Sequence, residues 1–313
     1  MEQKINFKQE RDFGTVLGDA LKFIKQNFKS FFGNVIVIVG PFLLLMGLGY
    51  GYMQQGLLAF RQNPLGGFKN FNAEFIIAII VVVLFGLIVN VLLNSVVFAY
   101  MGLYSEKNIG EKITISEVGQ IVRKRMGLMI GSVLTITVLF SFIIGIIVLI
   151  CAGIIAGLGV GGGILVGFIV FFSFAIFIPI LYYFMPASFY VIIRDDVFIF
   201  EAMGKVRKYL KDNFWWTWLI MVVTIIAISI LNFFFNLPAT VISMMDTFSR
   251  IKDLSQVGTQ NDNSFLLTLF YTLGIFLTSC ASTIGHVISA FNFLSQEEKH
   301  EGKGLLERIE EIK

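Results

Sequence analysis

Long apolar runs alternate with short polar segments along this chain of 313 residues. Six of the runs reach about 20 residues, the length that an α-helix needs to cross the hydrocarbon core of a bilayer. Polar and apolar residues do not alternate within them, so the pattern favours helices over strands. The sequence therefore predicts an all-α polytopic membrane protein with spans at 32–53, 75–104, 127–158, 163–193, 214–245 and 265–294.

Composition agrees with a membrane protein. Hydrophobic residues make up 56% of the chain, charged residues only 14%, and the mean hydropathy is +0.81, whereas soluble domains carry about 25% charged residues. The net charge of +3 is too small to imply a nucleic-acid partner. Both cysteines, Cys151 and Cys280, fall inside apolar runs, so neither a disulfide framework nor a zinc site is expected. The first 31 residues do not have the pattern of a cleaved signal peptide.

Lysine and arginine are distributed unevenly over the connections between the spans. The N-terminal segment, the second and fourth connections and the C-terminal tail hold 20 of them, and the remaining connections hold 4. Positive residues stay on the cytoplasmic side, so we expect both termini in the cytoplasm. Usage rich in Phe, Ile and Lys with few Cys is typical of a bacterial protein, and we expect the chain in the inner membrane.

Three basic amphipathic segments, at 14–32, 113–131 and 198–213, each precede an apolar run. Lys22 and Lys25 align with Lys208 and Lys211 when the first segment is set on the third. Such helices lie among headgroups, with their cations near anionic lipid. We predict one six-span domain, 1–295, made of three parallel units at 10–104, 113–193 and 198–294, each an interfacial helix plus a helical hairpin. The cytoplasmic tail, 296–313, carries a short amphipathic helix.

The second segment opens with Thr114-Ile115-Ser116-Glu117. Threonine followed three residues later by glutamate is typical of a capping box, in which each side chain accepts a hydrogen bond from the other residue's backbone N–H. We therefore expect a helix to begin at this point.

The best-preserved segment lies within 186–218. Pro186-Ala187, Asp195-Asp196, Phe200-Glu201-Ala202-Met203 and the basic run into Trp216 together resemble the bacterial glycerophosphoryl diester phosphodiesterase membrane-domain family. The layout is also similar to six-span inner-membrane proteins of the YciC type. The resemblance implies a membrane domain loosely associated with envelope homeostasis. It does not imply hydrolase activity, because no phosphodiesterase domain accompanies the spans. The match also departs from the family pattern at Lys205, where a small or hydroxyl residue is expected.

The third segment supplies one set of candidate contacts. Tryptophans near span ends anchor helices in the headgroup belt, and the neighbouring cations suit either a lipid headgroup or a partner protein. This candidate set comprises Lys205, Arg207, Lys208, Lys211, Trp215 and Trp216. The acidic residues Asp195, Asp196 and Glu201 are expected to cap the following helix and form local ion pairs; cation binding is the alternative.

Polar residues inside the spans supply the second set. Asparagines in a bilayer turn inward and hydrogen-bond between helices, or they line a polar cavity between the second and fifth spans. A histidine in a span is either a helix contact, a proton relay or a ligand contact. This second set comprises Asn90, Asn94, Asn232, Asn236 and His286.

Glycines four residues apart occur in the third and fourth spans: Gly127 and Gly131, Gly153 and Gly157, and Gly163 and Gly167. Such pairs let helices approach closely, so we expect them to hold these two spans in a tight hairpin. The cluster from Gly157 to Gly163 is not a phosphate loop, since apolar residues follow it where lysine and serine or threonine are required.

The sequence as a whole shows no paired acids, metal-ligand cluster or nucleophile–base set placed for catalysis. No catalytic, cofactor or metal site is therefore predicted. The expected function is non-enzymatic: an accessory or structural subunit of a membrane complex, or a factor in envelope lipid homeostasis. The alternative is a transporter or lipid carrier that uses the polar cavity. The expected partners are the bilayer, anionic headgroups and either another membrane protein or further copies of the chain.

Overall fold

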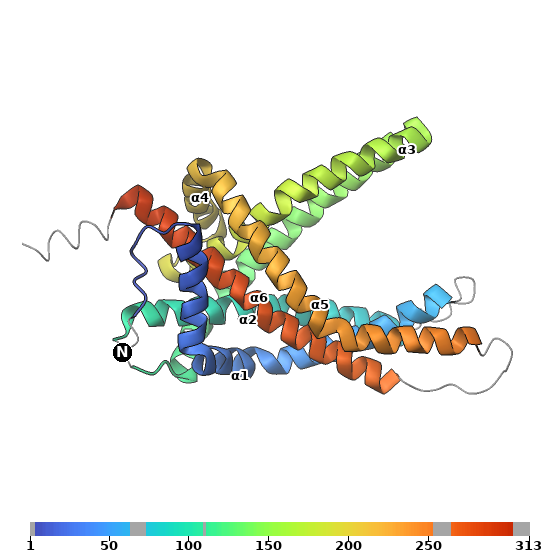
Figure 1. Ribbon diagram of the computed structural model, residues 1–313, viewed down its shortest axis with the longest axis horizontal. Helices are drawn as coiled ribbons and strands as arrows, with labels where there is room; N and C mark the ends of the chain where they lie inside the picture. The colour runs from blue at the N-terminus through green and yellow to red at the C-terminus, as the bar shows by residue number, and fades with distance from the viewer. Residues whose placement is uncertain (1–3, 63–72, 109–110, 253–263, 303–313) are drawn as a thin grey trace, which may run out of the picture. The chain divides into compact units, whose positions relative to one another are not determined.

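The computed structural model describes residues 4–62, 73–108, 111–252 and 264–302. Within these ranges no residue lies in a β-strand, which confirms the all-α prediction. The helices, shown in Figure 1, are α1 (Phe13–Gln62), α2 (Ala73–Glu106), α3 (Ile115–Asp195), α4 (Ile199–Leu210), α5 (Phe214–Lys252) and α6 (Ser264–Glu301), with a short 3-10 turn, η2 (Lys211–Asn213), between α4 and α5.

Six helical segments are long and apolar enough to cross a membrane. They are Phe13–Leu57, Ala73–Glu106, Ile115–Gly159, Gly161–Asp195, Ile199–Met245 and Ser264–Glu301. The prediction of six apolar helices of membrane-spanning length is confirmed, as a multi-pass membrane protein requires. Most segments extend beyond the predicted runs because the neighbouring amphipathic turns continue the same helix.

Side chains fix the first turns of two helices. Thr114 N donates to the Glu117 carboxylate at 2.8 Å and Glu117 N donates to Thr114 Oγ1 at 3.4 Å, so the predicted capping box is confirmed. Asp12 Oδ1 accepts from Thr15 N at 2.8 Å at the start of α1. Hydrogen bonds from Thr15 favour the ionised carboxylate and lower the pKa of Asp12.

Helix α3 is a hairpin of two arms rather than one straight rod. Gly159 has a φ of +54°, a left-handed conformation that interrupts the helix and reverses the chain (Figure 1). A side chain at Gly162 would place its Cβ 2.5 Å from the carbonyl oxygen of Ile154, so the turn also requires glycine there. The chain therefore reverses between the predicted third and fourth spans, which end at residue 158 and begin at residue 163.

Helix α6 continues past the predicted end of the last span. It ends at Glu301, where Gly302 has a φ of +61° and donates its N–H to the carbonyl oxygen of Glu298 at 2.8 Å. The first residues of the predicted tail therefore belong to α6. The predicted tail helix around Leu305 and Ile309 lies outside the described residues.

The described chain folds into two compact units, each built from separate segments. Unit 1 comprises Met1–Phe28, Asn94–Ile225 and Ile284–Lys313, and unit 2 comprises Lys29–Leu93 and Ile226–Thr283. In unit 1, large aromatic side chains are fully buried, among them Phe23, Phe98, Tyr100, Tyr183, Phe291 and Phe293. All of these side chains come from parts of α1, α2, α3 and α6.

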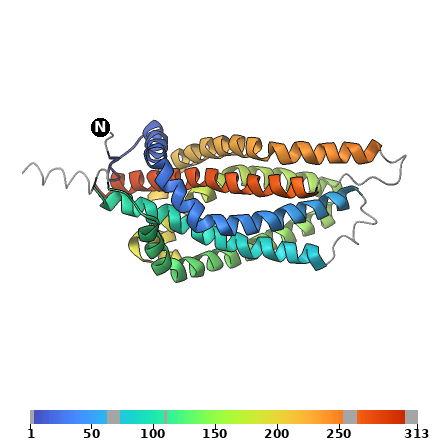
Figure 2. The same cartoon turned by 90° about the horizontal axis from the view of Figure 1, so that it is seen from below.

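Unit 2 is held together by close approach of its helices at glycines. In it α1 lies between α2 and α6, and α6 lies beside α5 (Figure 2). A Cβ at Gly47 would lie 2.7 Å from the Thr272 side chain, and a Cβ at Gly51 would lie 2.8 Å from Thr268 Cα. Close backbone contact of this kind is a main source of helix association in membranes.

The glycine pairs of α3 do not pack in this way. A Cβ at Gly127, Gly153, Gly157, Gly163 or Gly167 would meet nothing within 4 Å, and one at Gly131 would meet only Phe198, at 3.6 Å. The prediction that these pairs hold the two arms together is therefore wrong. The i, i+4 spacing shows only that a helix can be approached closely, and not by which neighbour.

We predict that Gly51→Leu destabilises the protein and that Gly157→Leu does not. Leucine at 51 forces α1 away from the α6 backbone, and overpacking of this kind costs about 1–3 kcal/mol. Leucine at 157 enters open space. Thermal unfolding in detergent should show a lower midpoint for Gly51→Leu only. Equal midpoints for the two variants would contradict the packing described for unit 2.

Candidate functional site

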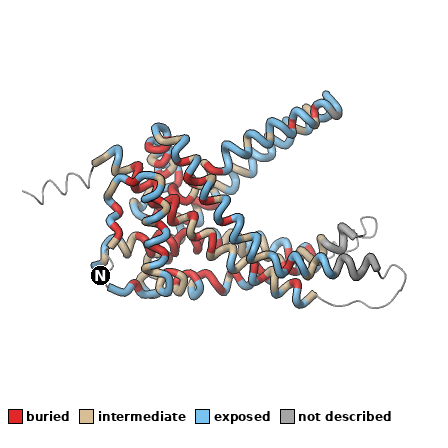
Figure 3. Tube along the Cα trace, in the orientation of Figure 1, coloured by how far each residue is buried: buried red, intermediate tan, exposed pale blue. Residues whose placement is uncertain are grey.

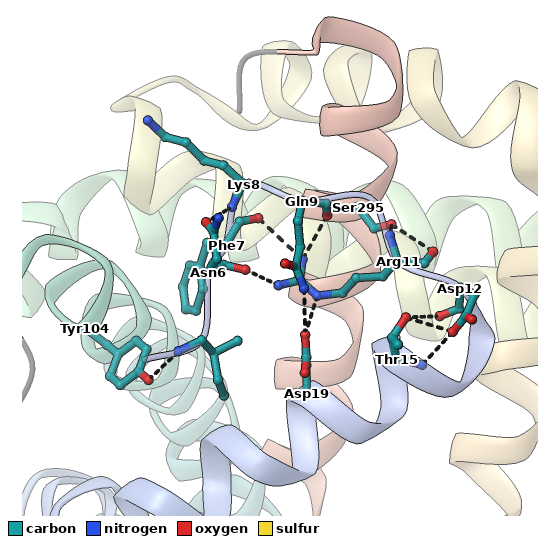
Figure 4. A network of polar contacts seen from close by, with 11 residues as sticks. Asn6, Phe7, Lys8, Gln9, Arg11, Asp12, Thr15, Asp19, Tyr104 and Ser295 are labelled. Carbon is teal, nitrogen blue, oxygen red and sulfur yellow. Dashed lines mark hydrogen bonds and ion pairs between the residues drawn. The ribbon is translucent and has the colours of Figure 1, made fainter. Parts of the chain in front are cut away.

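The first part of unit 1 is a non-helical segment, residues 4–12, here called the strap (Figure 4). Lys4 Nζ donates to the carbonyl oxygens of Ser105, in the last turn of α2, at 2.9 Å and of Lys107, just after α2, at 2.6 Å. The backbone N–H of Ile5 donates to Tyr104 Oη at 3.1 Å. These bonds tie the beginning of the chain to the end of α2.

The strap also binds α6. The ring of Phe7 is buried, with its centroid 5.1 Å from that of Phe291 and 5.7 Å from that of Tyr104. Arg11 N donates to Ser295 Oγ at 2.8 Å, and the same hydroxyl donates back to the Arg11 carbonyl oxygen at 3.1 Å. The strap therefore connects the two ends of the described chain.

The Arg11 side chain, with an exposed fraction of 0%, holds the strap in its fold. Its guanidinium donates to Asp19 Oδ2 at 2.8 Å, to the carbonyl oxygens of Gln9 at 3.1 Å and Phe7 at 3.4 Å, and to that of Asn6 (Figure 4). Burial lowers the pKa of Arg11 while Asp19 opposes that shift. Because arginine remains protonated in proteins, the side chain acts as a fixed cation.

A second arginine joins α3 to α6. The guanidinium of Arg194 forms a fork with the Glu297 carboxylate, with N–O distances of 2.6 and 2.7 Å, and its Nε donates to Asp195 Oδ1 at 2.7 Å. It also lies over the rings of Tyr190 at 5.4 Å and Phe293 at 5.6 Å. Two-point carboxylate binding is the strongest geometry available to arginine, so this pair fixes the end of α3 on α6.

The acidic turn after α3 forms ion pairs, as predicted. Lys205 Nζ lies 3.1 Å from Asp195 Oδ2 and 3.5 Å from Glu201 Oε1. Arg125 pairs with Asp196. The turn is therefore bonded to α3 and to α4.

The predicted capping of α4 holds only in part: Glu201 lies in the first turn, where the helix dipole favours an acid, but Asp195 and Asp196 do not cap the helix. The residue before Ile199 is Phe198, and no side-chain hydrogen bond caps the helix there. Asp196 instead ends α3: its φ is +59°, and its N–H donates to the Ile192 carbonyl oxygen at 3.1 Å. Asp196 has a short polar side chain and can adopt this left-handed backbone conformation, which lets the chain leave α3 and enter α4 within a few residues.

Uncharged polar groups extend the network along α6. Gln296 accepts from Tyr183 Oη at 2.8 Å and donates to Thr217 Oγ1 at 2.6 Å, and Asn292 donates to the same Thr217 oxygen at 3.3 Å. All four of these side chains are buried. Their mutual bonds satisfy polar groups that would otherwise destabilise the buried interface of α3, α5 and α6.

A pocket of about 360 Å³ lies beside this network in unit 1. The strap, α2, α3, α4 and α6 all contribute to its wall. The lining residues carry charges of both signs and several aromatic rings: Phe7, Lys8, Ser105, Tyr190, Arg194, Asp195, Lys205, Tyr209, Leu294, Glu297, Glu298 and Glu301. Tyr209 Oη donates to the Glu301 carboxylate across the wall. A cavity of this size and polarity suits a small charged group.

The predicted basic cluster divides between this pocket and the surface. Lys205 is partly exposed and lines the pocket. Arg207, Lys208 and Lys211 are exposed, and Lys208 Nζ lies 5.4 Å from the centre of the Tyr209 ring. The structure therefore brings only one of the four cations together with the acids of α6.

Both predicted tryptophans are exposed, in the first turns of α5. The Trp216 ring packs edge-on against Phe13 at 5.9 Å, and the Trp215 ring lies 6.1 Å from that of Trp218. Trp218 donates its ring N–H to the Ala175 carbonyl oxygen at 3.2 Å, which joins α5 to the second arm of α3. The tryptophans do not line the charged pocket.

The predicted polar cavity draws on residues from both units, and it remains a prediction. Asn236 Nδ2 donates to the Asn232 carbonyl oxygen at 2.8 Å and weakly to Thr278 Oγ1 at 3.4 Å on α6, an interhelical contact of the predicted kind. Asn90 is exposed and Asn94 is buried. His286 lies beside Phe98, with ring centroids 6.2 Å apart, and its Nδ1 has no hydrogen-bond partner among the described residues.

Comparisons with known proteins add nothing to this geometry. No protein-family model, curated protein or solved structure matches the chain.

Sequence reasoning missed the strap and the Arg194–Glu297 fork. Both depend on contacts between residues far apart in the chain, 284 positions for Arg11 and Ser295 and 103 for Arg194 and Glu297. One signal was present: Arg11 is an arginine in a segment whose other cations are lysines. Only arginine offers five donors in a planar fork, which is what several acceptors around one buried cation require.

We predict that Arg11→Met lowers the free energy of unfolding by about 3 kcal/mol, because it removes the charged partner of Asp19 and the side-chain donor of three carbonyl groups. Arg207→Met, which removes an exposed cation from α4, is the matched control. The midpoint of thermal unfolding in detergent should fall for Arg11→Met and stay unchanged for the control. Similar midpoints for both variants would show that the strap does not stabilise the protein.

Proposed function

We propose that the protein is a non-enzymatic integral protein of a bacterial cytoplasmic membrane that serves as a structural or accessory subunit of a membrane complex. Its six membrane-length helices support the membrane placement. The uneven distribution of lysine and arginine supports cytoplasmic N- and C-termini. The observation that carries the subunit role is the exposure of α3 beyond its packed ends.

The outer part of α3, residues 138–178 and here called the outer hairpin, is exposed within unit 1 (Figure 3). Among its residues whose side chains the structure describes, only Gly162 and Val166 are buried. Large apolar side chains point outward from both arms, including Phe142, Leu149, Phe168, Phe171, Phe174 and Phe177. The two arms thus present apolar surface in several directions.

The open glycines of the outer hairpin favour a protein neighbour. In unit 2, Gly47 and Gly51 are covered closely by α6, whereas Gly153 and Gly157 on α3 have room above them. Close approach at small residues is how helices associate in lipid, where apolar surface alone gives no driving force. A helix of another protein, or of a second copy, fits this surface as α6 fits α1.

The amphipathic segments support attachment to the membrane surface. α4 buries Ile199, Ala202, Val206, Tyr209 and Leu210 on one face and exposes cations on the other. It is the only one of the three predicted interfacial segments that forms a separate helix within the described residues; the other two are the first turns of α1 and α3. The threefold repeat and the relation to the phosphodiesterase membrane-domain family remain proposals.

A factor in envelope lipid homeostasis is the second form of this proposal. The charged pocket of unit 1 favours it, because Tyr190 and Leu294 in its wall belong to the last turns of apolar runs. A pocket at such a position can receive the polar part of a lipid.

Photo-crosslinking in living cells tests the subunit role. A photoreactive amino acid at Phe142 or Phe171, with exposed fractions of 70% and 67%, should capture one protein reproducibly. The control position is Ile77 of α2, which is 58% exposed and equally apolar. We expect a discrete protein adduct from the hairpin positions and none from Ile77. Lipid adducts alone at all three positions would overturn the proposal.

Cysteine labelling tests the orientation. In a variant with Cys151→Ser and Cys280→Ser, new cysteines at Gln62 and Thr259 should react with a membrane-impermeant maleimide added to intact cells. A cysteine at the exposed Arg207 should react only after the cells are broken. Labelling of position 207 in intact cells, with 62 and 259 protected, would reverse the proposed topology.

A further inference from the structure

We propose that unit 1 selects anionic phospholipids through a group of exposed cations that the protein itself does not neutralise, here called the basic group. Its members lie on the three amphipathic segments, and they are Lys22, Lys25, Arg123, Lys124, Arg207, Lys208 and Lys211. The proposal rests on the membrane placement proposed above. It does not depend on a partner at the outer hairpin.

The acids of the three amphipathic segments already have partners. The pairs are Asp19 with Arg11, Glu117 with Lys107, Glu201 with Lys205, and Asp212 with His300 when that histidine is protonated. By contrast, no side chain of the basic group has an ion-pair or hydrogen-bond partner among the described residues, and all of them are exposed. Each segment therefore presents positive charge that is free to meet an external anion.

The basic group lies at one end of unit 1. Both views of the chain place the beginnings of α1 and α3 and the whole of α4 at the end away from the reversal at Gly159 (Figures 1 and 2). Each segment continues into an apolar run that is long enough to cross a bilayer. Cations at the beginning of such a run lie where the apolar helix meets water, which is the level of lipid phosphates.

Exposed apolar side chains accompany the cations and favour a lipid over a soluble polyanion. Phe28, which is 58% exposed, follows Lys25 by three residues, and Phe200, which is 59% exposed, precedes Arg207 by seven. Both spacings place the two side chains on one face of a helix. A nucleic acid or an acidic protein loop would neutralise the cations and leave these rings in water. The headgroup layer offers phosphates to the cations and acyl chains to the rings.

The excess of positive charge selects an anionic headgroup. A zwitterionic headgroup carries its own cation beside the phosphate, so an unpaired lysine or arginine gains little from it. A headgroup with net negative charge attracts each nearby lysine or arginine, and one such cation is expected to strengthen binding about fivefold. Phosphatidylglycerol, whose only charge is its phosphate, is the simplest lipid with this property.

The tryptophans provide a built-in reporter for this surface. The chain has three, Trp215, Trp216 and Trp218, and all lie in the first turns of α5, which follows α4 and η2. Trp216 also packs against Phe13 at the start of α1, with ring centroids 5.9 Å apart. Bromine atoms on lipid acyl chains quench tryptophan fluorescence on contact. Quenching therefore measures which lipid lies beside the basic group.

The test uses the purified full-length protein in vesicles of phosphatidylglycerol and phosphatidylcholine in equal amounts. One series contains brominated phosphatidylglycerol and the other contains brominated phosphatidylcholine. We expect stronger quenching in the first series, equivalent to about fivefold tighter binding of phosphatidylglycerol. The difference should disappear near 1 M salt, where the screening length falls to about 3 Å. Equal quenching in the two series at low salt, or a difference that salt does not reduce, would refute the proposal.

Substitutions connect the preference to the basic group. The triple variant Arg207→Gln, Lys208→Gln and Lys211→Gln should bring the preference for phosphatidylglycerol close to unity. The matched control, Arg207→Lys, Lys208→Arg and Lys211→Arg, keeps all three charges and should keep the preference. Lys22→Gln with Lys25→Gln makes the same test on α1 if the first variant fails to fold. Unchanged preference in the folded neutral variants would show that other groups select the lipid.

The two brominated series also separate lipid selectivity from membrane placement. Strong and equal quenching in both series would place the tryptophans in the bilayer and refute only the selectivity for anionic lipid. Absence of quenching in both series would refute the membrane placement as well. Neither outcome bears on the outer hairpin, whose partner is sought separately by crosslinking at Phe142 and Phe171.

Discussion

The fork between the Arg194 guanidinium and the Glu297 carboxylate is the contact on which the polar end of unit 1 depends. It joins the last turn of α3 to α6, and through Asp195 it also positions Lys205 of α4. Removing one member of a shielded ion pair leaves the other charge poorly solvated, so these residues act together. The pocket takes its shape from this arrangement, since four of its lining residues belong to the fork and its immediate partners.

Hydropathy was sufficient to predict the number and type of the membrane-length helices. In a bilayer the backbone N–H and C=O groups must hydrogen-bond to each other, and a long apolar run achieves this by forming an α-helix. Two local features could also be read from the sequence: the Thr114–Glu117 cap and the reversal within the glycine cluster at Gly159 each depend on neighbouring residues only. The capping of α4 by Asp195 and Asp196 could not. The strap and the pocket depend on which distant segments meet. Nothing in the residues around Arg11 indicates Ser295, so pattern reasoning had no access to that bond.

The glycine pairs show most clearly what a sequence pattern cannot predict. Gly47 and Gly51 in α1 have the same spacing as Gly153 and Gly157 in α3, yet α6 covers the first pair and the second pair is open. Glycines four residues apart show that another helix can approach closely. Which helix does so is determined by the tertiary structure. This difference separates a glycine pair that stabilises the chain itself from one that leaves room for another helix, and it is why the outer hairpin supports a role in a complex.

The bond between the strap and α6 also has a consequence for biosynthesis. Arg11 is synthesised well before Ser295, which follows it 284 positions later in the chain. At a translation rate of roughly 5–20 residues per second, about 15 to 60 seconds pass between the synthesis of Arg11 and that of Ser295. During that time the spans already inserted have no completed unit 1, and the pocket does not exist. Folding of α6 therefore completes unit 1, so a nascent chain truncated before α6 should remain a substrate for quality-control proteases.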